Sequence, residues 1–443
     1  MLLSVLLACT GEPTTAPEPP APPPDILLVV MDTVRADALS TYGYHRPTAP
    51  NLDALAARGM LFERAISPGS WTWPSHGSLL TGRWPWEHGA HFTTAADGAL
   101  RPSEDLQIAP LDPSVPTLAE QLSAAGYRTA FVSGNPIIGP SSGMARGFEI
   151  ARVARGDAAV VAAALEQVQA DDGRPLLLFV NLFGAHAPYS PQPVPWLADA
   201  APLPSWLAPY TLPDGSVRLF NGEPSGVFSF IRGELDVPAG GLQPVRDLYD
   251  GEIVAVDYFL GQLAAAWPAD GVIAVTSDHG EHLGERGLLD HGRTLYPEVT
   301  DVPLVLYGPG RIAPGRVSEP VSTRDIAPTL LSLAGQGGGP GLLAPAGGPV
   351  FSAAWMDPHW ARELGGRLAA DHRLIVEGDD RLIVSSSGET TMLGAPEREA
   401  ALRAALEAAV PPLVHSGEAI APSAETEAAL RALGYVEPET PQP

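Results

Sequence analysis

Runs of apolar residues alternate with helical patterns along most of the chain. Residues 26–31 (Ile-Leu-Leu-Val-Val-Met) form a continuous apolar run, which is typical of a strand buried on both faces of a parallel sheet. Similar runs predict strands at 127–133, 176–182, 272–276 and 304–307. Helices are predicted in the intervals, at residues 49–59, 75–80, 115–126, 158–170, 248–263 and 326–334.

This alternation of strands and helices predicts an α/β fold in which a mostly parallel sheet is sandwiched by helices. Residues 336–349 are rich in glycine and proline, and they separate a large domain at 25–335 from a small α+β subdomain at 336–443. Residues 190–243 show little periodicity, and a loop of this length is usually functional. Within the subdomain we expect a hairpin of residues 373–376 and 381–384, and helices at 395–410 and 426–433.

The net charge of the chain argues against a nucleic-acid partner. The 443 residues carry a formal net charge of −25, and the chain contains arginine but no lysine. Nucleic-acid binding needs a basic face, so no nucleic-acid partner is expected. An anionic substrate would have to be held by a local cation rather than by the overall field. Because Cys9 is the single cysteine, the chain cannot form an internal disulfide or a cysteine cluster for zinc.

The first nine residues predict export. They read Met-Leu-Leu-Ser-Val-Leu-Leu-Ala-Cys, which resembles the lipobox of bacterial lipoproteins, with cleavage before Cys9 and a lipid on its sulfur. Residues 10–24 are rich in proline and would form an extended tether. We therefore expect a lipid-anchored protein of the bacterial cell envelope, periplasmic or on the outer membrane. The alternative is a secreted protein with an ordinary signal peptide and an incidental cysteine.

Three polar residues follow two of the predicted strands. Asp32 comes directly after the strand at 26–31, and Asp278 and His279 come after the strand at 272–276. The carboxyl ends of parallel strands form the edge at which open α/β sheets bind ligands. Two carboxylates and an imidazole at that edge can hold a divalent metal ion. Taken alone, Asp32 is equally well explained as a cap or turn residue.

A hydroxyl group precedes the predicted helix at 75–80. Thr72 stands two residues before Pro74, and proline suits the first position of a helix. Thr72 would then lie just upstream of the helix N-terminus, where free N–H groups and the helix dipole favour an anion. A threonine hydroxyl is a weak nucleophile, so it needs a base or a metal to activate it. The alternative is that Thr72 or Ser70 only caps the helix.

Short motifs are spread over residues 25–335, among them Pro-Ser-His-Gly-Ser-Leu-Leu-Thr-Gly at 74–82 and Ser-Asp-His-Gly-Glu at 277–281. The others are residues 26–37, 48–53, 88–89, 125–129, 291–296 and 325–330, with Leu-Arg-Ala-Leu-Gly-Tyr at 430–435 in the tail. Together they resemble the sulfatase family within the alkaline phosphatase superfamily. The resemblance implies an alkaline-phosphatase-like catalytic domain with a smaller C-terminal subdomain, and metal-dependent hydrolysis of an ester.

The resemblance also assigns roles to single residues. His186 matches a family histidine that contacts the anion or the leaving group, although alone it would pass for a satisfied loop histidine. Arg293 stands where the family usually has a lysine facing the anion, and its planar fork suits a tetrahedral oxyanion. Alone, Arg293 would pass for a surface arginine. The resemblance makes Thr72 the nucleophile, and it matches four residues to the metal site: Asp32, Asp278, His279 and Thr72.

The sequence departs from the family around the nucleophile. The family's sulfatases carry Cys or Ser in a Cys/Ser-x-Pro-x-Arg motif and convert it to formylglycine. Thr72 is not a substrate for that conversion, and His76 replaces the arginine. A second aspartate ligand is often found where this chain has Thr33, and the family's Lys-Trp-His segment corresponds to residues 134–136 (Gly-Asn-Pro), so two anion contacts are missing. Thr72 and His76 instead resemble phosphodiesterases and phosphoglycol or phosphoethanolamine transferases of the superfamily.

We therefore expect a metal-dependent hydrolase of sulfate or phosphate esters, with phosphoesters favoured and no formylglycine. One divalent ion is expected: Ca²⁺ or Mn²⁺ suits the oxygen ligands, and His279 also suits Zn²⁺. Two alternatives stay open. One is a transferase that moves a phospho group to an envelope glycan or lipid, with residues 190–243 binding the acceptor, and the other is a catalytically inactive binding protein. Further candidates for lining the site are His76, His88, His282 and His291.

Overall fold

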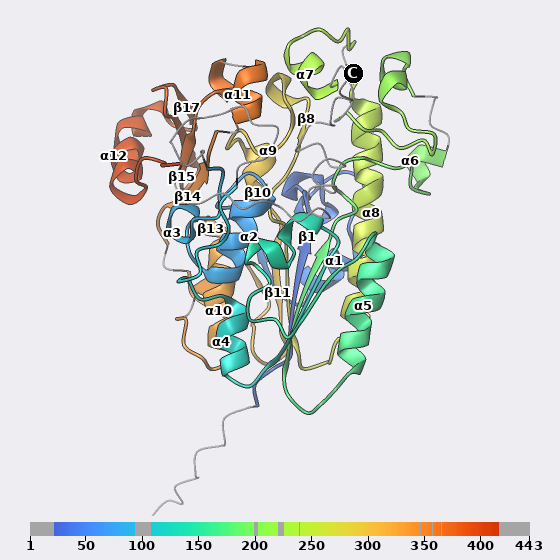
Figure 1. The fold of residues 1–443 in the computed structure, drawn as a ribbon, viewed down its shortest axis with the longest axis vertical. Coiled ribbons are helices and arrows are strands. Elements are labelled where there is room, and N and C mark those ends of the chain that lie inside the picture. The colour runs from blue at the N-terminus through green and yellow to red at the C-terminus, as the bar shows by residue number, and fades with distance from the viewer. Residues whose placement is uncertain are drawn as a thin grey trace, which may run out of the picture.

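The computed structural model describes residues 22–93, 108–198, 203–219 and 226–415, apart from the single residues 239, 340, 346, 357 and 365. Its centre is an eight-stranded sheet (Figure 1). The sheet is parallel except for β11, which runs antiparallel to both of its neighbours. In their order across the sheet, the strands are β12 (Gly315–Val317), β2 (Met60–Phe62), β11 (Leu304–Tyr307), β7 (Val272–Thr276), β1 (Ile26–Met31), β6 (Leu176–Leu182), β4 (Arg128–Ser133) and β5 (Ile150–Val153).

Helices cover both faces of this sheet because successive side chains of a strand point to opposite sides. In β1, alternate residues from Ile26 to Val30 pack with α2, α4 and α10, and those from Leu27 to Met31 pack with α1, α5 and α8. Figure 1 shows α5 and α8 on one side of the sheet and α4 and α10 on the other. The predicted sandwich is therefore confirmed. The helices of this part are α1 (Pro50–Ala56), α2 (Thr72–Thr81), α3 (Pro85–His88), α4 (Leu118–Ala124), α5 (Asp157–Gln169), α8 (Gln243–Ala266), α9 (Pro297–Thr300) and α10 (Ile326–Leu333).

The C-terminal part forms a separate antiparallel sheet. Its central pair, β15 (His372–Glu377) and β16 (Asp380–Ser385), is the predicted hairpin. The sequence did not predict the outer strands β14 (Val350–Ala354) and β17 (Thr390–Leu393). The helix predicted at 395–410 is α12 (Glu399–Ala409), which packs on this sheet. The helix predicted at 426–433 lies outside the described residues, as do Cys9 and most of the tether.

The long insertion at 190–243 meets the C-terminal subdomain. It contains the short helices α6 (Pro195–Ala198) and α7 (Gly226–Ile231), and Figure 1 places both near one end of the molecule with α11 (Pro358–Leu364). Arg232, directly after α7, pairs with Glu363 of α11 at 2.9 Å. In the described part of the chain, no helix has the length and apolar character needed to cross a membrane. Two small sheets complete the fold: β10 (Asp301–Val302), β3 (Ala65–Ile66) and β13 (Val321–Ser322), and the pair β8 (His282–Leu283) and β9 (Leu289–Asp290).

Candidate active site

The carboxyl ends of β1 and β7 bring the predicted metal ligands together. The two strands pair in parallel with Val30 opposite Thr276, so Asp32 and Asp278 leave the sheet side by side. One ligand atom from each of Asp32, Asp278 and His279 lies within 4.8 Å of the others. The Nε2 atom of His279 is 3.3 Å from Oδ2 of Asp278. All three side chains are at most 1% exposed, so their charges cannot be neutralised by bulk water.

The chemistry of this triad fits a divalent cation. Oδ1 of Asp32 and Oδ2 of Asp278 are buried and have no hydrogen-bond partner among the described residues. Burial, followed by the charge of Asp278, raises the pKa of Asp32 to about 7, and burial raises the pKa of Asp278 to about 7. Nδ1 of His279 donates to the carbonyl oxygen of Gly280 at 2.9 Å, which leaves the lone pair on Nε2. Two carboxylate oxygens without hydrogen-bond partners and a neutral imidazole nitrogen are suitable ligands for a divalent cation.

Helix α2 carries Thr72 to the triad. The helix begins at Thr72 itself, so the prediction that Thr72 lies just upstream of the helix was wrong. The helix starts early because Trp71 is extended, and because Pro74 falls in the first turn, where its missing N–H is not used. Oγ1 of Thr72 is 3.4 Å from Nε2 of His279. Atoms that bind one ion at about 2.0–2.1 Å in a tetrahedron lie about 3.3–3.4 Å apart, so this spacing suits a shared ion.

Two asparagines hold the first carboxylate. Nδ2 of Asn135 donates to Oδ2 of Asp32 at 2.9 Å, and Nδ2 of Asn181 donates to the same oxygen at 3.0 Å. Both bonds engage Oδ2 and leave Oδ1 for a cation. Asn135 is also 3.3 Å from Oγ1 of Thr72. Asn135 is therefore a neutral donor that lies between Thr72 and Asp32.

A strained backbone residue fixes the second carboxylate. Thr33 has a φ of 60°, a left-handed conformation that a β-branched residue rarely adopts. In this conformation its N–H donates to Oδ1 of Asp278 at 3.2 Å. The hydroxyl of Tyr249 donates to the carbonyl oxygen of Thr33 at 2.8 Å and accepts from the N–H of Arg35 at 3.0 Å. This left-handed conformation therefore connects the end of β1 to Asp278, which follows β7.

His76 occupies the position of the family's arginine. Its Nδ1 donates to the carbonyl oxygen of Thr72 at 2.9 Å, one turn back along α2, and lies 3.4 Å from Oδ2 of Asp278. Complete burial lowers its pKa to about 3, so this histidine is neutral at neutral pH. His76 thus contributes packing and hydrogen bonding to the site but no positive charge.

His186 and His291 lie just outside the group formed by Asp32, Asp278 and His279. His186 follows β6, stacks on Phe183 with ring centroids 4.5 Å apart, and donates from Nδ1 to the carbonyl oxygen of Ala187 at 2.7 Å. Burial lowers the pKa of His186 to about 4, so its imidazole is neutral at neutral pH. The ring of His291 lies 4.2 Å from that of His279 and 5.2 Å from that of His186. His291 therefore brings a third imidazole to the same place.

Arg293 lies further from Asp32, Asp278 and His279 than these histidines do. Its guanidinium pairs with Oδ2 of Asp290 at 2.5 Å and lies 3.4 Å over the ring of Trp360, which α11 supplies. The side chain is 8% exposed, so it is not the surface arginine of the simpler interpretation. Its charge is shared with a buried carboxylate, and a substrate anion would have to compete with Asp290 for it.

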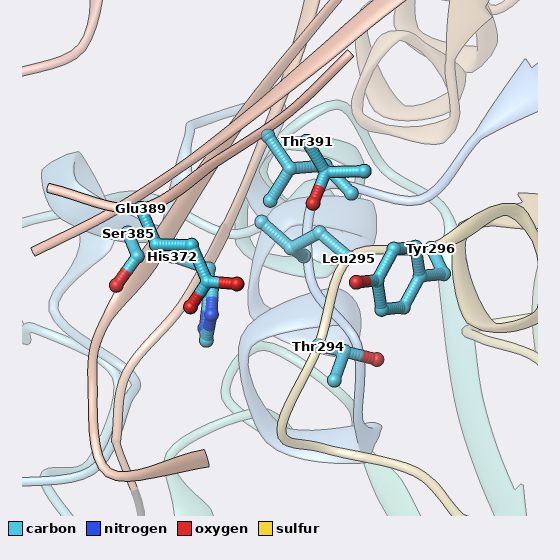
Figure 2. Close-up of a pocket in the computed structure, with 8 residues that line it drawn as sticks. Thr294, Leu295, Tyr296, His372, Ser385, Glu389 and Thr391 are labelled. Atoms are coloured by element: carbon cyan, nitrogen blue, oxygen red, sulfur yellow. The ribbon is translucent and has the colours of Figure 1, made fainter. Parts of the chain in front are cut away.

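A cavity near this region is too small for a substrate. Figure 2 shows it between residues 294–296 and the C-terminal sheet, with His372, Glu389 and Thr391 on the sheet side. Its volume is about 20 Å³, which is enough for about one water molecule. We therefore do not assign substrate binding to this cavity.

Comparisons with known proteins identify the family. The profile of the sulfatase family matches residues 24–336, and the chain belongs to this family. Bovine arylsulfatase A is 30% identical over 348 residues, which cover 71% of this chain and 65% of that protein, so the match spans just under two thirds of the relative. A solved structure with its substrate D-glucosamine-2-N,6-O-disulfate has a TM-score of 0.64 at 18% identity, over 87% of this chain and 97% of that one. The phosphonate monoester hydrolase of Agrobacterium radiobacter has a TM-score of 0.61 at 20% identity, over 84% and 89%. These structures confirm the expected alkaline-phosphatase-like fold.

The structure thus brings together Asp32, Asp278, His279 and Thr72, and it sets His186 and Arg293 further out. Sequence reasoning missed the two asparagines. Asn181 had a signal, because it is the one polar residue in the apolar run at 176–182. Asn135 had a weaker one, because it follows the strand at 127–133 much as Asp32 follows its own strand.

Proposed function

We propose that the protein is a metal-dependent hydrolase of sulfate or phosphate esters in which Thr72 is the nucleophile. The observation that carries this proposal is the 3.4 Å separation of Oγ1 of Thr72 from Nε2 of His279, beside two orphaned carboxylate oxygens. Phosphoesters are favoured, because threonine cannot become formylglycine. The fold similarity to a phosphonate monoester hydrolase agrees with this preference.

The residues of the chain suggest a two-step reaction. A cation bound by Asp32, Asp278 and His279 would lower the pKa of the Thr72 hydroxyl and offset the negative charge of the ester. Oγ1 of Thr72 attacks phosphorus or sulfur, and the bond to the leaving oxygen breaks. The Thr72 hydroxyl gives up its proton as the new bond forms, and the leaving oxygen takes up a proton as the alcohol departs. Because His186 is neutral and its Nδ1–H bonds the carbonyl oxygen of Ala187, it would first take up the Thr72 proton on Nε2 and then pass that proton to the leaving oxygen; a nearby histidine is the alternative donor. Water then attacks the same atom, which frees Thr72 and releases phosphate or sulfate.

A panel of aryl esters tests the proposal. Turnover of a phosphate monoester, a phosphodiester and a sulfate is measured with added Ca²⁺, Mn²⁺ or Zn²⁺, for the wild type and for Thr72→Ala and Thr72→Ser. We expect metal-dependent turnover that Thr72→Ala reduces by at least about 10³-fold and that Thr72→Ser partly retains. Thr81→Ala serves as a control, since that hydroxyl donates to the carbonyl oxygen of Gly77 and accepts from the N–H of Arg83, at the other end of the helix from Thr72. Sulfate turnover that survives Thr72→Ala would refute the mechanism.

The same assay separates the alternatives. A transferase would leave the phospho group on an added glycan or lipid acceptor rather than on water. An inactive binding protein would turn over no ester and would bind no ion that Asp278→Ala abolishes.

We further propose that the protein acts in the bacterial cell envelope, anchored by a lipid on Cys9 after removal of residues 1–8. The proposal rests on the sequence of residues 1–9 and on the proline-rich tether. Metabolic labelling with a fatty acid, lost in Cys9→Ala, is the expected result. A protein released into the medium without label would be the secreted alternative.

A further inference from the structure

A second group of metal-ligating side chains lies beside the first. The β8–β9 hairpin pairs His282 with Asp290, and this register sets Glu281 and His291 opposite each other at its open end. Ligand atoms of Glu281, Asp290 and His291 all lie within 4.8 Å of one another. Nδ1 of His291 is 3.0 Å from Oδ1 of Asp290 and 3.3 Å from Oε1 of Glu281. These spacings approach the edges of about 3.3–3.4 Å expected around a tetrahedral ion with N and O ligands.

Neighbouring side chains bind both carboxylates. Arg293 pairs with Oδ2 of Asp290 at 2.5 Å, so the oxygen that faces His291 is the other one, Oδ1. The hydroxyl of Tyr189 donates to Oε2 of Glu281 at 3.2 Å, and Nδ1 of His291 lies 3.3 Å from Oε1 and 3.4 Å from Oε2, so both oxygens of this carboxylate face the imidazole. Metal sites are commonly built in this way, with neighbours that bind each ligand.

Two buried carboxylates lie close together in this group. Glu281 and Asp290 are at most 5% exposed, and Arg293 supplies one positive charge in the contacts described above. Two carboxylates at this separation repel each other, and burial makes their charges costly unless a proton or a cation joins them. The neutral nitrogen of an imidazole favours the cation, since it adds a third ligand.

From this geometry we propose a second divalent-cation site, formed by Glu281, Asp290 and His291. The mixed nitrogen and oxygen ligands suit Zn²⁺ or Mn²⁺. His291 connects this site to the first, because its ring lies 4.2 Å from that of His279. A cation held there would place positive charge beside the group formed by Asp32, Asp278 and His279. This site does not depend on the proposed function, since its ligands are separate from the triad.

Metal stoichiometry tests the proposal. The full-length protein is stripped with a chelator, reloaded with Zn²⁺ or Mn²⁺, freed of excess ion by gel filtration, and analysed for metal per chain by mass spectrometry. We expect two ions in the wild type, one in Glu281→Gln and one in Asp278→Asn. Glu252→Gln is the matched control, because this buried carboxylate bonds the N–H of Ser190 and the side chain of Gln192 and should keep two ions.

The outcomes are distinct. A wild type that binds one ion, lost in Asp278→Asn and kept in Glu281→Gln, overturns the second site and leaves the metal centre of the proposed function standing. Two ions that both survive Glu281→Gln also overturn it. Two ions of which Glu281→Gln removes one and Asp278→Asn removes none would support the second site and count against the first. If circular dichroism shows that Glu281→Gln does not fold, His291→Phe, which keeps a ring against His279, replaces it with the same expectations.

Discussion

Replacing Asn135 by alanine should weaken metal binding while leaving every ligand in place. The amide of Asn135 donates to Oδ2 of Asp32 at 2.9 Å, and Asn181 is the second donor to that oxygen. A hydrogen bond to a charged group contributes about 1.5–3 kcal/mol. Loss of a neighbour that orients a metal ligand typically costs about 10–100-fold in affinity, or about 1.4–2.8 kcal/mol. The two estimates agree, so we expect the Kd for Mn²⁺ or Zn²⁺ to rise by about 10–100-fold in Asn135→Ala.

The assay is competition with a chromophoric chelator, and the chain offers a matched control. Asn51 donates from Nδ2 to Oδ2 of the buried Asp257 at 2.9 Å, in a contact between α1 and α8 rather than at the site. Asn51→Ala removes the same kind of bond, so it should reduce the free energy of unfolding and leave the metal Kd unchanged. A Kd in Asn135→Ala within about twofold of the wild type would refute the reasoning, because Asn135 would then not orient Asp32.

Two further predictions concern the same carboxylates. Because the pKa values of Asp32 and Asp278 are raised to about 7 in the metal-free protein, metal must displace protons below that pH, so affinity should fall as pH decreases from about 7 to about 5. Carboxylates with ordinary pKa values near 3.8 would give a flat profile over this range when Kd is measured by titration at each pH. Tyr249→Phe removes the hydroxyl that bonds Thr33 and Arg35, and we expect a loss of about 1–3 kcal/mol in denaturant unfolding together with weaker metal binding. Unchanged metal binding in Tyr249→Phe would mean that the strained Thr33 does not position Asp278.

The sequence predicts Asp32, Asp278 and His279 and the five neighbouring strands β11, β7, β1, β6 and β4 because these follow simple patterns, whereas the short strands β12, β2 and β5 were not predicted. Parallel strands that are buried on both faces read as continuous apolar runs, and the polar residue after such a run must lie at the ligand-binding edge. Asp32, Asp278 and His279 meet this condition, and the parallel pairing of β1 with β7 brings them side by side. No comparable pattern marks β17, all of whose residues are only partly buried, or the positive φ of Thr33, which depends on Asp278 from far along the chain.

The position of Arg293 shows a different limit of sequence reasoning. The resemblance to the family implied that Arg293 faces the substrate anion. It carried no information about Asp290, which pairs with the guanidinium at 2.5 Å. The backbone of the hairpin decides this pairing, since Asp290 itself has a φ of 75°. Which of two neighbouring side chains reaches the site, His291 or Arg293, is a property of that turn and not of the residue types.

The charge of the site restricts the kind of ester that it can stabilise. Asp32 and Asp278 cancel the charge of one divalent ion. In the resemblance to the family, an arginine position is held here by His76, whose pKa is lowered to about 3, and a lysine position is held by Gly134, which has no charge. The remaining cation, Arg293, is paired. A doubly charged phosphate monoester therefore meets little net positive charge, while a phosphodiester or a sulfate ester carries one negative charge less.

We accordingly expect kcat/KM to be at least about 10-fold higher for bis(p-nitrophenyl) phosphate or p-nitrophenyl sulfate than for p-nitrophenyl phosphate, since about 1.4 kcal/mol of unscreened repulsion suffices for that ratio. A cation at the second site would add positive charge, so the preference should be stronger in Glu281→Gln than in the wild type. A wild type that prefers the doubly charged ester, with the preference unchanged in Glu281→Gln, would show that the charge balance drawn from these residues is wrong.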